Sequence, residues 1–139
     1  MIQIISGVKG KGKTKYLIQK ANEAIRTANG NVVYLDKNIK HMYELSNKIR
    51  LINVREYLDE SYEGFLGFVN GIISQDHDLE YMFLDSFLTV SAVPEDKVEY
   101  LLDKLNETSD KYCVNFVLSI SIDSENLPEK YRDNIVISL

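Results

Sequence analysis

The chain opens with Ile2-Gln3-Ile4-Ile5-Ser6-Gly7-Val8-Lys9-Gly10-Lys11-Gly12-Lys13-Thr14, and the residues from Gly7 to Thr14 match the pattern G-x-x-x-x-G-K-[ST] without a gap. A loop that wraps phosphate oxygens must turn its backbone N–H groups inward, which calls for glycine where φ is positive. Gly7, Gly10 and Gly12 provide that freedom. The stretch therefore predicts a loop that binds the phosphates of a nucleoside triphosphate.

The residues on either side of this loop predict a strand before it and a helix after it. Residues 2–5 are mostly apolar and rich in isoleucine, as expected of a strand buried on both faces. Apolar residues then recur on one helical face at Leu17, Ala21, Ala24, Ile25 and Ala28. Gly30 ends the pattern. Strand, loop and helix in this order favour the phosphate loop over the alternative, a surface turn rich in glycine and lysine.

Two loop residues have specific expected roles. Lys13 is expected to reach the β- and γ-phosphates, and the Thr14 hydroxyl is expected to ligate Mg²⁺. The first N–H groups of the following helix have no partner inside the helix and are also expected to face the anion. The rest of the predicted nucleotide-binding set is Gly7, Val8, Lys9, Gly10, Lys11, Gly12 and Lys15. Apart from Lys13, the lysines are either solvated loop charges or help to hold phosphates or a polyanionic partner.

A second feature of a nucleotide site is Tyr81-Met82-Phe83-Leu84-Asp85, four apolar residues followed by a carboxylate. A strand of this kind lies in the sheet centre and presents its terminal carboxylate beside the phosphate loop. There it can hold Mg²⁺ through a water molecule or polarise the Thr14 hydroxyl. Thr14 and Asp85 are therefore the predicted metal-binding residues. Asp36, at the end of the apolar stretch 31–36, is the rival carboxylate.

The remaining hydrophobic patterns predict strands alternating with helices along the chain. Further strands are expected at 50–54, 115–120 and 134–139, and further helices at 38–48, 62–73, from Pro94 through Leu105, and at 127–132. Such alternation implies an α/β fold: a three-layer αβα sandwich around a mostly parallel sheet of five or six strands. With 139 residues, the whole chain 1–139 is expected to form one domain.

The bulk composition limits the classes of partner. The net charge is −5 and the pI is about 5.0, which argues against a broad surface for nucleic acid or anionic membranes. No segment approaches the roughly 20 apolar residues that span a bilayer, and the N-terminus opens directly into a strand, so we expect a cytoplasmic protein. The single cysteine, Cys113, cannot form an internal disulfide and is expected to be a small buried hydrophobe.

These residues resemble the P-loop NTPase superfamily, and the strand order that they imply resembles its RecA-like division. In that division an additional strand separates the loop strand from the strand that ends in aspartate. The chain is also similar to short stand-alone ATP-binding proteins of unassigned role. A GTPase is not indicated, because Asn47-Lys48-Ile49-Arg50 lacks the aspartate of the guanine motif and Asp85-Ser86-Phe87-Leu88 lacks the switch glycine.

The groups that would support hydrolysis are less well defined. Many ATPases with an additional strand place a glutamate directly after the aspartate, but this chain has Ser86 there, a weak base at neutral pH that can still bond the γ-phosphate or its water. RecA-like motors instead carry a carboxylate at the end of a neighbouring strand. Asp36 either takes that role or caps the helix after it. Arg132 is either a charge-stabilising finger or a solvated helix residue.

The sequence thus predicts an ATP-binding protein that uses Mg²⁺, with Lys13, Asp36 and Ser86 as candidate catalytic residues. It favours a slow ATPase, or a binding module that nucleotide switches on and off, with a protein partner or a second copy of the chain completing the site. A small nucleoside or nucleotide kinase is the alternative, although the chain has only four arginines and no arginine-rich lid.

Overall fold

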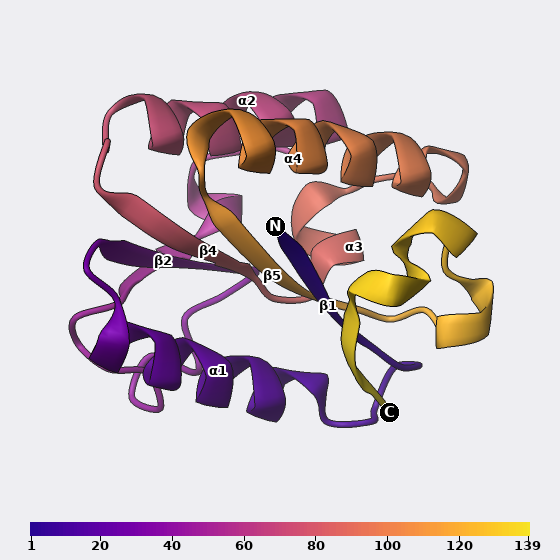
Figure 1. The fold of residues 1–139 in the computed structure, drawn as a ribbon, viewed down its shortest axis with the longest axis horizontal. Coiled ribbons are helices and arrows are strands. Elements are labelled where there is room, and N and C mark those ends of the chain that lie inside the picture. The colour runs from indigo at the N-terminus through magenta and orange to yellow at the C-terminus, as the bar shows by residue number, and fades with distance from the viewer.

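The computed structural model describes residues 1–139, which form a six-stranded sheet with helices on both faces (Figure 1). All neighbouring strands are parallel, in the order β3-β2-β4-β5-β1-β6. In chain order the strands are β1 (Ile2–Ser6), β2 (Asn31–Asp36), β3 (Arg50–Asn53), β4 (Leu79–Leu84), β5 (Asn115–Ile120) and β6 (Ile135–Ser138). The expectation of a mostly parallel sheet of five or six strands is confirmed.

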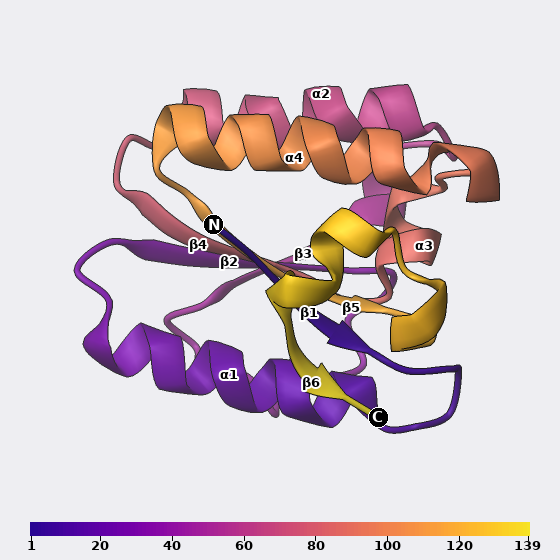
Figure 2. The same ribbon diagram turned by 45° about the vertical axis from the view of Figure 1, so that its right-hand side comes forward.

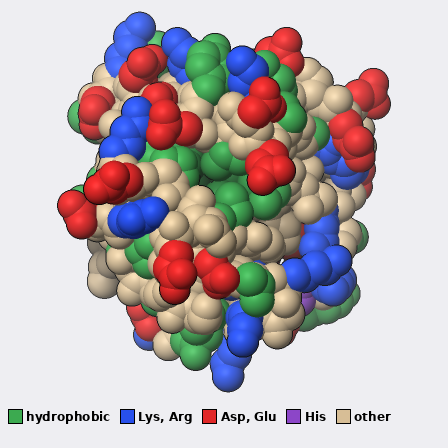
Figure 3. Space-filling view, turned by 90° about the vertical axis from the view of Figure 1, so that its right-hand side faces the viewer, with side chains coloured by type: hydrophobic (Ala, Val, Ile, Leu, Met, Phe, Trp, Pro, Cys, Tyr) green, Lys and Arg blue, Asp and Glu red, His purple; other side chains and the backbone are tan.

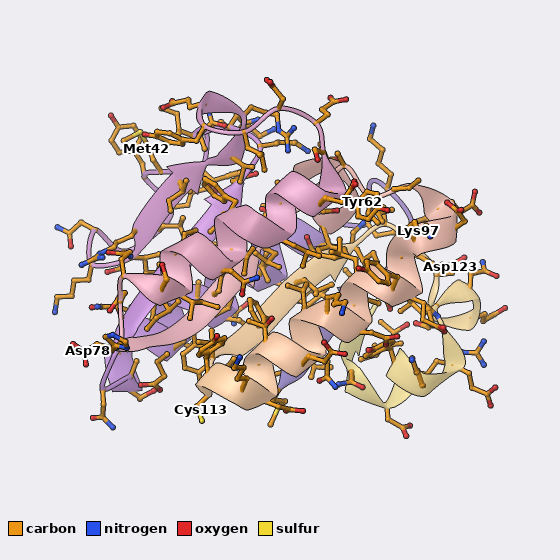
Figure 4. The ribbon with its side chains drawn as sticks, turned by 90° about the horizontal axis from the view of Figure 1, so that it is seen from above. Met42, Tyr62, Asp78, Lys97, Cys113 and Asp123 are labelled. Atoms are coloured by element: carbon orange, nitrogen blue, oxygen red, sulfur yellow. The ribbon has the colours of Figure 1, made fainter.

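The helices form the two outer layers of the sandwich. Helix α1 (Lys13–Thr27) covers one face of the sheet alone, whereas α2 (Tyr62–Ser74) and α4 (Val98–Tyr112) cover the other (Figures 1 and 2). Seen from above, α2 and α4 lie side by side across the sheet (Figure 4). A short helix, α3 (Phe87–Ser91), lies on the same side as α2 and α4 and follows the end of β4. The predicted αβα sandwich is therefore confirmed.

The strands are mostly apolar because helices cover both faces of the sheet. On one side, Leu17 and Ala21 of α1 pack in a cluster with Tyr34, Phe83 and Val117 of the sheet. The opposite side holds a larger cluster that includes residues of α2, α3, α4 and the facing side of the strands. Two separate apolar layers fix the sheet between the helices, and the strand ends are left to carry polar groups.

Strand order and register bring the candidate carboxylates to one edge. Strand β5 lies between β1 and β4, so the additional strand that the sequence implied is present. Leu84 pairs with Leu35 on one side and with Leu118 on the other. The next residue of each strand continues this row, which places Asp36, Asp85 and Ser119 next to one another at the carboxyl edge. Ligands of open parallel sheets bind at this edge.

The predicted helix at 38–48 is wrong, because this segment forms consecutive turns. Leu45 and Ile49 are buried as the apolar pattern required. Asn22 of α1, however, accepts a bond from the Ser46 N–H and donates one to the Glu44 carbonyl. Side-chain bonds of this kind offer the backbone an alternative to helical pairing.

Two smaller differences concern the ends of elements. Cys113 is exposed, so the expectation that it is buried is wrong. It ends α4 with a left-handed backbone (φ 57°), which turns the chain from the helix into β5. The predicted helix at 127–132 is a 3-10 segment at Glu129–Asn134. None of the helices has the length and apolar character needed to cross a bilayer.

The turn between α1 and β2 requires glycine at position 30. A Cβ atom there would overlap the backbone oxygen of Asp78, whose carbonyl accepts a bond from the Asn31 N–H. Gly30→Ala is expected to lower the free energy of unfolding by about 1–3 kcal/mol, the usual cost of forcing atoms into a packed site. Denaturant titration measures the change.

Gly67→Ala is the matched control, because Gly67 lies on an exposed position of α2 with open space around the added atom. There alanine should stabilise the helix by roughly 0.5–1 kcal/mol. Equal effects of the two substitutions would contradict this account of the Gly30 turn.

Candidate functional site

The loop between β1 and α1 has the backbone of an anion-binding turn. Gly10 and Gly12 have φ values of 88° and 84°, a left-handed conformation that side chains rarely adopt. Helix α1 begins directly after Gly12, without a side-chain cap and without an acidic residue in its first turn. The first N–H groups of α1 therefore lack a side-chain acceptor and face the loop with the positive end of the helix dipole.

A polar cavity of about 400 Å³, here called the loop cavity, lies in front of this turn. Its lining contains three lysines, no carboxylate and one hydrophobic residue. The lining residues are Lys9, Gly10, Gly12, Lys13, Thr14, Lys37, Ser86, Leu88, Thr89, Ser119 and Ser121. Cations and hydroxyl groups without carboxylates on the wall make a cavity suited to an anion.

Lys13 is buried within the loop. Its side chain is 7% exposed, and its Nζ donates a hydrogen bond to the Val8 carbonyl at 3.1 Å. Burial lowers the pKa of Lys13, and the charge of Asp85 partly offsets this effect. The ammonium group has no ion-pair partner within 4 Å. An incoming anion would therefore find a largely desolvated cation held only by a neutral carbonyl.

The Asp85 carboxylate is the best-bonded group of the site. It is 1% exposed and follows β4. Oδ1 accepts bonds from the hydroxyls of Thr14 and Ser119, each at 3.0 Å, and Oδ2 accepts one from the Tyr34 hydroxyl at 2.7 Å. Burial, followed by the charge of Asp85, raises the pKa of Tyr34, so its proton stays in place as a donor. The predicted Thr14 and Asp85 pair is thus in direct contact.

Asp36 is buried beside Asp85 but is poorly satisfied. It is 2% exposed; Oδ1 accepts a bond from the Lys37 N–H at 2.7 Å, whereas Oδ2 has no partner. Burial, and then the charge of Asp85, raise the pKa of Asp36 above its usual range. No helix follows Asp36, so the alternative role as a helix cap is wrong. A buried, unpartnered carboxylate oxygen is costly and is retained where it has a use.

Ser86 has a strained backbone at the edge of the loop cavity. Its φ of 53° and ψ of 58° lie in the left-handed region, which is costly for a residue other than glycine. The Ser86 N–H donates to the Ser119 hydroxyl at 2.8 Å, and its Oγ accepts a bond from Lys37 Nζ at 3.2 Å. Ser86 thus links Ser119 of the Asp85 cluster to Lys37. Backbone strain of this kind is common at functional sites.

Some residues of the site are absent from the sequence prediction. Lys37, Tyr34 and Ser119 reach the site from β2 and β5, and no motif marks them. Their only signal is position, since Lys37 follows the Asp36 strand and the other two lie near strand ends. Of the predicted residues, Lys11 and Lys15 are exposed and do not line the loop cavity. Arg132 is exposed and donates to the Glu125 carbonyl, away from the cavity lining.

The oxygen groups of the site fit a hard divalent cation that keeps most of its water. No group of three or more His, Cys, Asp and Glu residues forms a metal cluster anywhere in the chain. Mg²⁺ does not need one, because it binds through one or two protein oxygens together with phosphate oxygens and water. Thr14 Oγ1 and the Asp85 carboxylate could hold such an ion at the edge of the loop cavity.

Comparisons with known proteins identify the fold and nothing finer. No protein-family model and no curated protein matches the sequence. Among solved structures, the flagellar accessory protein FlaH from Methanocaldococcus jannaschii is similar with a TM-score of 0.61 and 16% identity, over 93% of this chain and 63% of that one. A KaiC-like protein from Pyrococcus horikoshii OT3 is similar with a TM-score of 0.62 and 16% identity, over 85% and 61%. This chain spans less than two thirds of either protein. It shares the fold of these two proteins.

Asp36→Asn is expected to raise the melting temperature of the free protein at neutral pH, because the variant removes a buried charge. The raised pKa of Asp36 determines in which direction the stability of the wild type changes with pH. Between about pH 4 and the raised native pKa, the unfolded chain releases this proton while the folded protein keeps it, so the wild type loses stability as pH rises through this range. The advantage of the variant should therefore shrink toward acid pH.

Thermal melts between about pH 4.5 and 8 test this sign. Asp59→Asn, at an exposed carboxylate, is the control and should leave the melting temperature unchanged. A variant that matches the wild type at every pH would show that the Asp36 carboxylate carries no buried-charge penalty.

Proposed function

We propose that this protein binds a nucleoside triphosphate, ATP by default, together with Mg²⁺ at the carboxyl edge of its sheet. The observation that supports this most strongly is the 3.0 Å hydrogen bond from the Thr14 hydroxyl to Asp85 Oδ1, directly beside the loop that holds Lys13. The bond joins two separate sequence signatures, 71 residues apart, at one point of the fold. A glycine and lysine surface turn gives no reason for that contact.

In this proposal, each wall of the loop cavity has a part in binding. Lys13 exchanges its bond to the Val8 carbonyl for bonds to the β- and γ-phosphates, and the N-terminal N–H groups of α1 bind phosphate oxygens. Thr14 and Asp85 hold the ion. When bound there, Mg²⁺ would supply positive charge that offsets the charge of the phosphates.

Asp36 is the candidate base of this proposal and lies behind the lining of the loop cavity, 2% exposed. Its Oδ2 is a free acceptor, and its raised pKa makes it a stronger base than an ordinary carboxylate. It can therefore orient an attacking water and take its proton. Ser86 Oγ accepts a bond from Lys37, and its O–H remains free to donate to a phosphate oxygen or to the attacking water.

Hydrolysis is expected to be slow, because no arginine lines the loop cavity to stabilise charge in the transition state. A partner or a second copy of this chain would supply that group. The protein would then act as a nucleotide-gated binding module, and its rate of ATP hydrolysis would rise when the partner or second copy binds. We therefore favour an ATPase-like switch over the kinase alternative.

Lys13→Ala is expected to lower Mg-ATP affinity about a hundredfold, since hydrogen bonds to charged groups contribute about 1.5–3 kcal/mol each. Isothermal titration calorimetry measures the affinity, and circular dichroism checks that the variant is folded. Lys11→Ala is the matched control, because Lys11 belongs to the same loop but is exposed and outside the cavity lining. Equal, small effects of both variants would remove the loop from the proposed site.

Lys37 is expected to distinguish ATP from ADP. It lines the loop cavity together with residues of the phosphate loop, and its Nζ donates a hydrogen bond to Ser86 Oγ at the cavity wall. A γ-phosphate there would gain a charge-assisted bond that ADP cannot make. Lys37→Ala should therefore weaken ATP about tenfold and leave ADP affinity unchanged.

The control for Lys37 is Lys40→Ala, which removes an exposed lysine from the same loop and should affect neither nucleotide. Calorimetric titrations of ATP and ADP, each with Mg²⁺, give the two affinities. Equal losses for ATP and ADP in Lys37→Ala would mean that Lys37 does not contact the third phosphate.

A further inference from the structure

A second cavity of about 710 Å³ adjoins the loop cavity and has no part in the proposed nucleotide site. It lies among the phosphate loop, α3, the N-terminal end of α4 and the segment that follows β5. The two cavities share Leu88 and Ser121 as lining residues. On the face shown in Figure 3, hydrophobic side chains gather near the centre with Asp and Glu side chains beside them.

The floor of this second cavity is apolar. Val93 and Val98 are 8% and 5% exposed, and Leu88 and Ile122 are partly buried against the same core cluster. Val8 of the phosphate loop, 41% exposed, completes the apolar wall. Exposed apolar surface in a concave site favours an occupant that removes it from water.

The rim of the cavity carries negative charge alone. No lysine or arginine lines it, and the lining carboxylates are Glu95, Asp96, Glu99 and Asp123. None of these four takes part in an ion pair. Three of them lie near the N-terminus of α4, where acidic residues stabilise the helix dipole. Asp123 comes from the segment after β5, at the N-cap of the 3-10 segment Ser124–Asn126, where its side chain makes no capping bond; the dipole of α4 does not account for it. We refer to this site as the acidic cavity.

An apolar floor below an acidic rim selects for an occupant that has both a cation and an apolar group. Nucleic acid and anionic lipids are repelled by the rim and by the net charge of −5. A polyamine satisfies the carboxylates but leaves the floor exposed to water. A protein segment with Lys or Arg next to Leu, Ile or Val satisfies both, through charge and burial together.

We propose that the acidic cavity is the docking site for a basic, apolar segment of a protein partner, and that nucleotide binding alters its affinity. The proposed docking is inferred from the acidic cavity alone, whereas the coupling of docking to nucleotide binding rests on the proposed function. Val8 provides the link, because its side chain lines the acidic cavity while its carbonyl accepts the bond from Lys13 Nζ. When phosphates bind Lys13, the Val8 carbonyl loses its hydrogen bond from Lys13 Nζ at the wall of the acidic cavity.

Helix α3 provides a second link between the two cavities. Leu88 lines both of them, and α3 begins directly after the strained Ser86 that Lys37 holds. A shift of Ser86 or Val8 on nucleotide binding would therefore change the shape of the acidic cavity. Coupling between two sites is reciprocal, so the docked segment must change nucleotide affinity by the same factor.

The test uses capped, fluorescently labelled peptides with the repeat Leu-Arg-Leu-Arg as the probe. Three further probes distinguish binding through charge from binding through burial of apolar side chains: a Leu-Glu-Leu-Glu peptide, a Gly-Arg-Gly-Arg peptide and spermidine. Anisotropy gives affinity, and ¹H-¹⁵N NMR shift changes locate the bound peptide on the protein. The variant Glu95→Gln/Glu99→Gln/Asp123→Asn removes three of the four rim carboxylates and leaves Asp96.

The matched control variant is Asp59→Asn/Glu60→Gln/Glu63→Gln, which removes three exposed carboxylates around the start of α2. It makes the same change in net charge and a similar change near a helix terminus. The Leu-Arg peptide is expected to bind the wild type and the control equally. It should bind the rim variant about tenfold more weakly, because that variant removes three carboxylates that would pair with the arginines. Shift changes should centre on Val93, Val98 and Ile122.

Three results would overturn the docking site: no binding of the Leu-Arg peptide, equal binding to the rim variant, or equally tight binding of Gly-Arg peptide or spermidine. The coupling is tested by repeating the titration with Mg-ATP and with ADP, in wild type and in Lys13→Ala. A peptide affinity that nucleotide leaves unchanged, in protein shown by calorimetry to bind Mg-ATP, overturns the coupling. Failure of the wild type to bind any nucleotide would instead refute the proposed function, with the docking result read separately.

Discussion

The Asp85 carboxylate accepts hydrogen bonds from hydroxyl groups on three other elements, and the whole site depends on this arrangement. Thr14 comes from α1, Tyr34 from β2 and Ser119 from β5, while Asp85 itself follows β4. Because the carboxylate is 1% exposed, these bonds replace the water that it loses on folding. One side chain therefore positions the phosphate loop against the centre of the sheet, and loss of any donor would leave a buried charge short of a partner.

Asp36, the carboxylate beside Asp85, differs from it because its hydrogen-bonding capacity is only partly used. Asp36 lies next to Asp85 in the strand register, yet one of its oxygens is buried without a partner. Lys13 is likewise a buried cation that bonds only to a carbonyl. Sites that bind and transform ligands commonly hold such unsatisfied groups at a cost to stability. Lys13 and Asp36 each have unused bonding capacity, which a triphosphate would satisfy at Lys13 and an attacking water at Asp36.

Much of the fold and the main contacts of the site follow from sequence, and the omissions have physical reasons. The phosphate loop and the strand that ends at Asp85 were predictable because each needs particular residue types at fixed spacing. The segment 38–48 has a helical apolar pattern, but bonds from Asn22 hold it as turns, and long-range bonds leave no local pattern. Lys37 and Ser119 escaped prediction for the same reason, since strand order and register alone bring them to the loop. The left-handed backbone of Ser86 is set by tertiary contacts that no residue type indicates.

The most direct test of the proposed metal-dependent triphosphate site is calorimetric titration of the wild-type protein with ATP, with and without Mg²⁺. The wild-type protein is expected to bind one ATP per chain in a saturable manner. Its affinity for ATP should fall at least about tenfold when Mg²⁺ is removed, because the Thr14 and Asp85 oxygens then have no ion to hold. Binding of ATP with the same affinity in both conditions would contradict the assigned role of Thr14 and Asp85. Absence of ATP binding in both would contradict the proposed site as a whole.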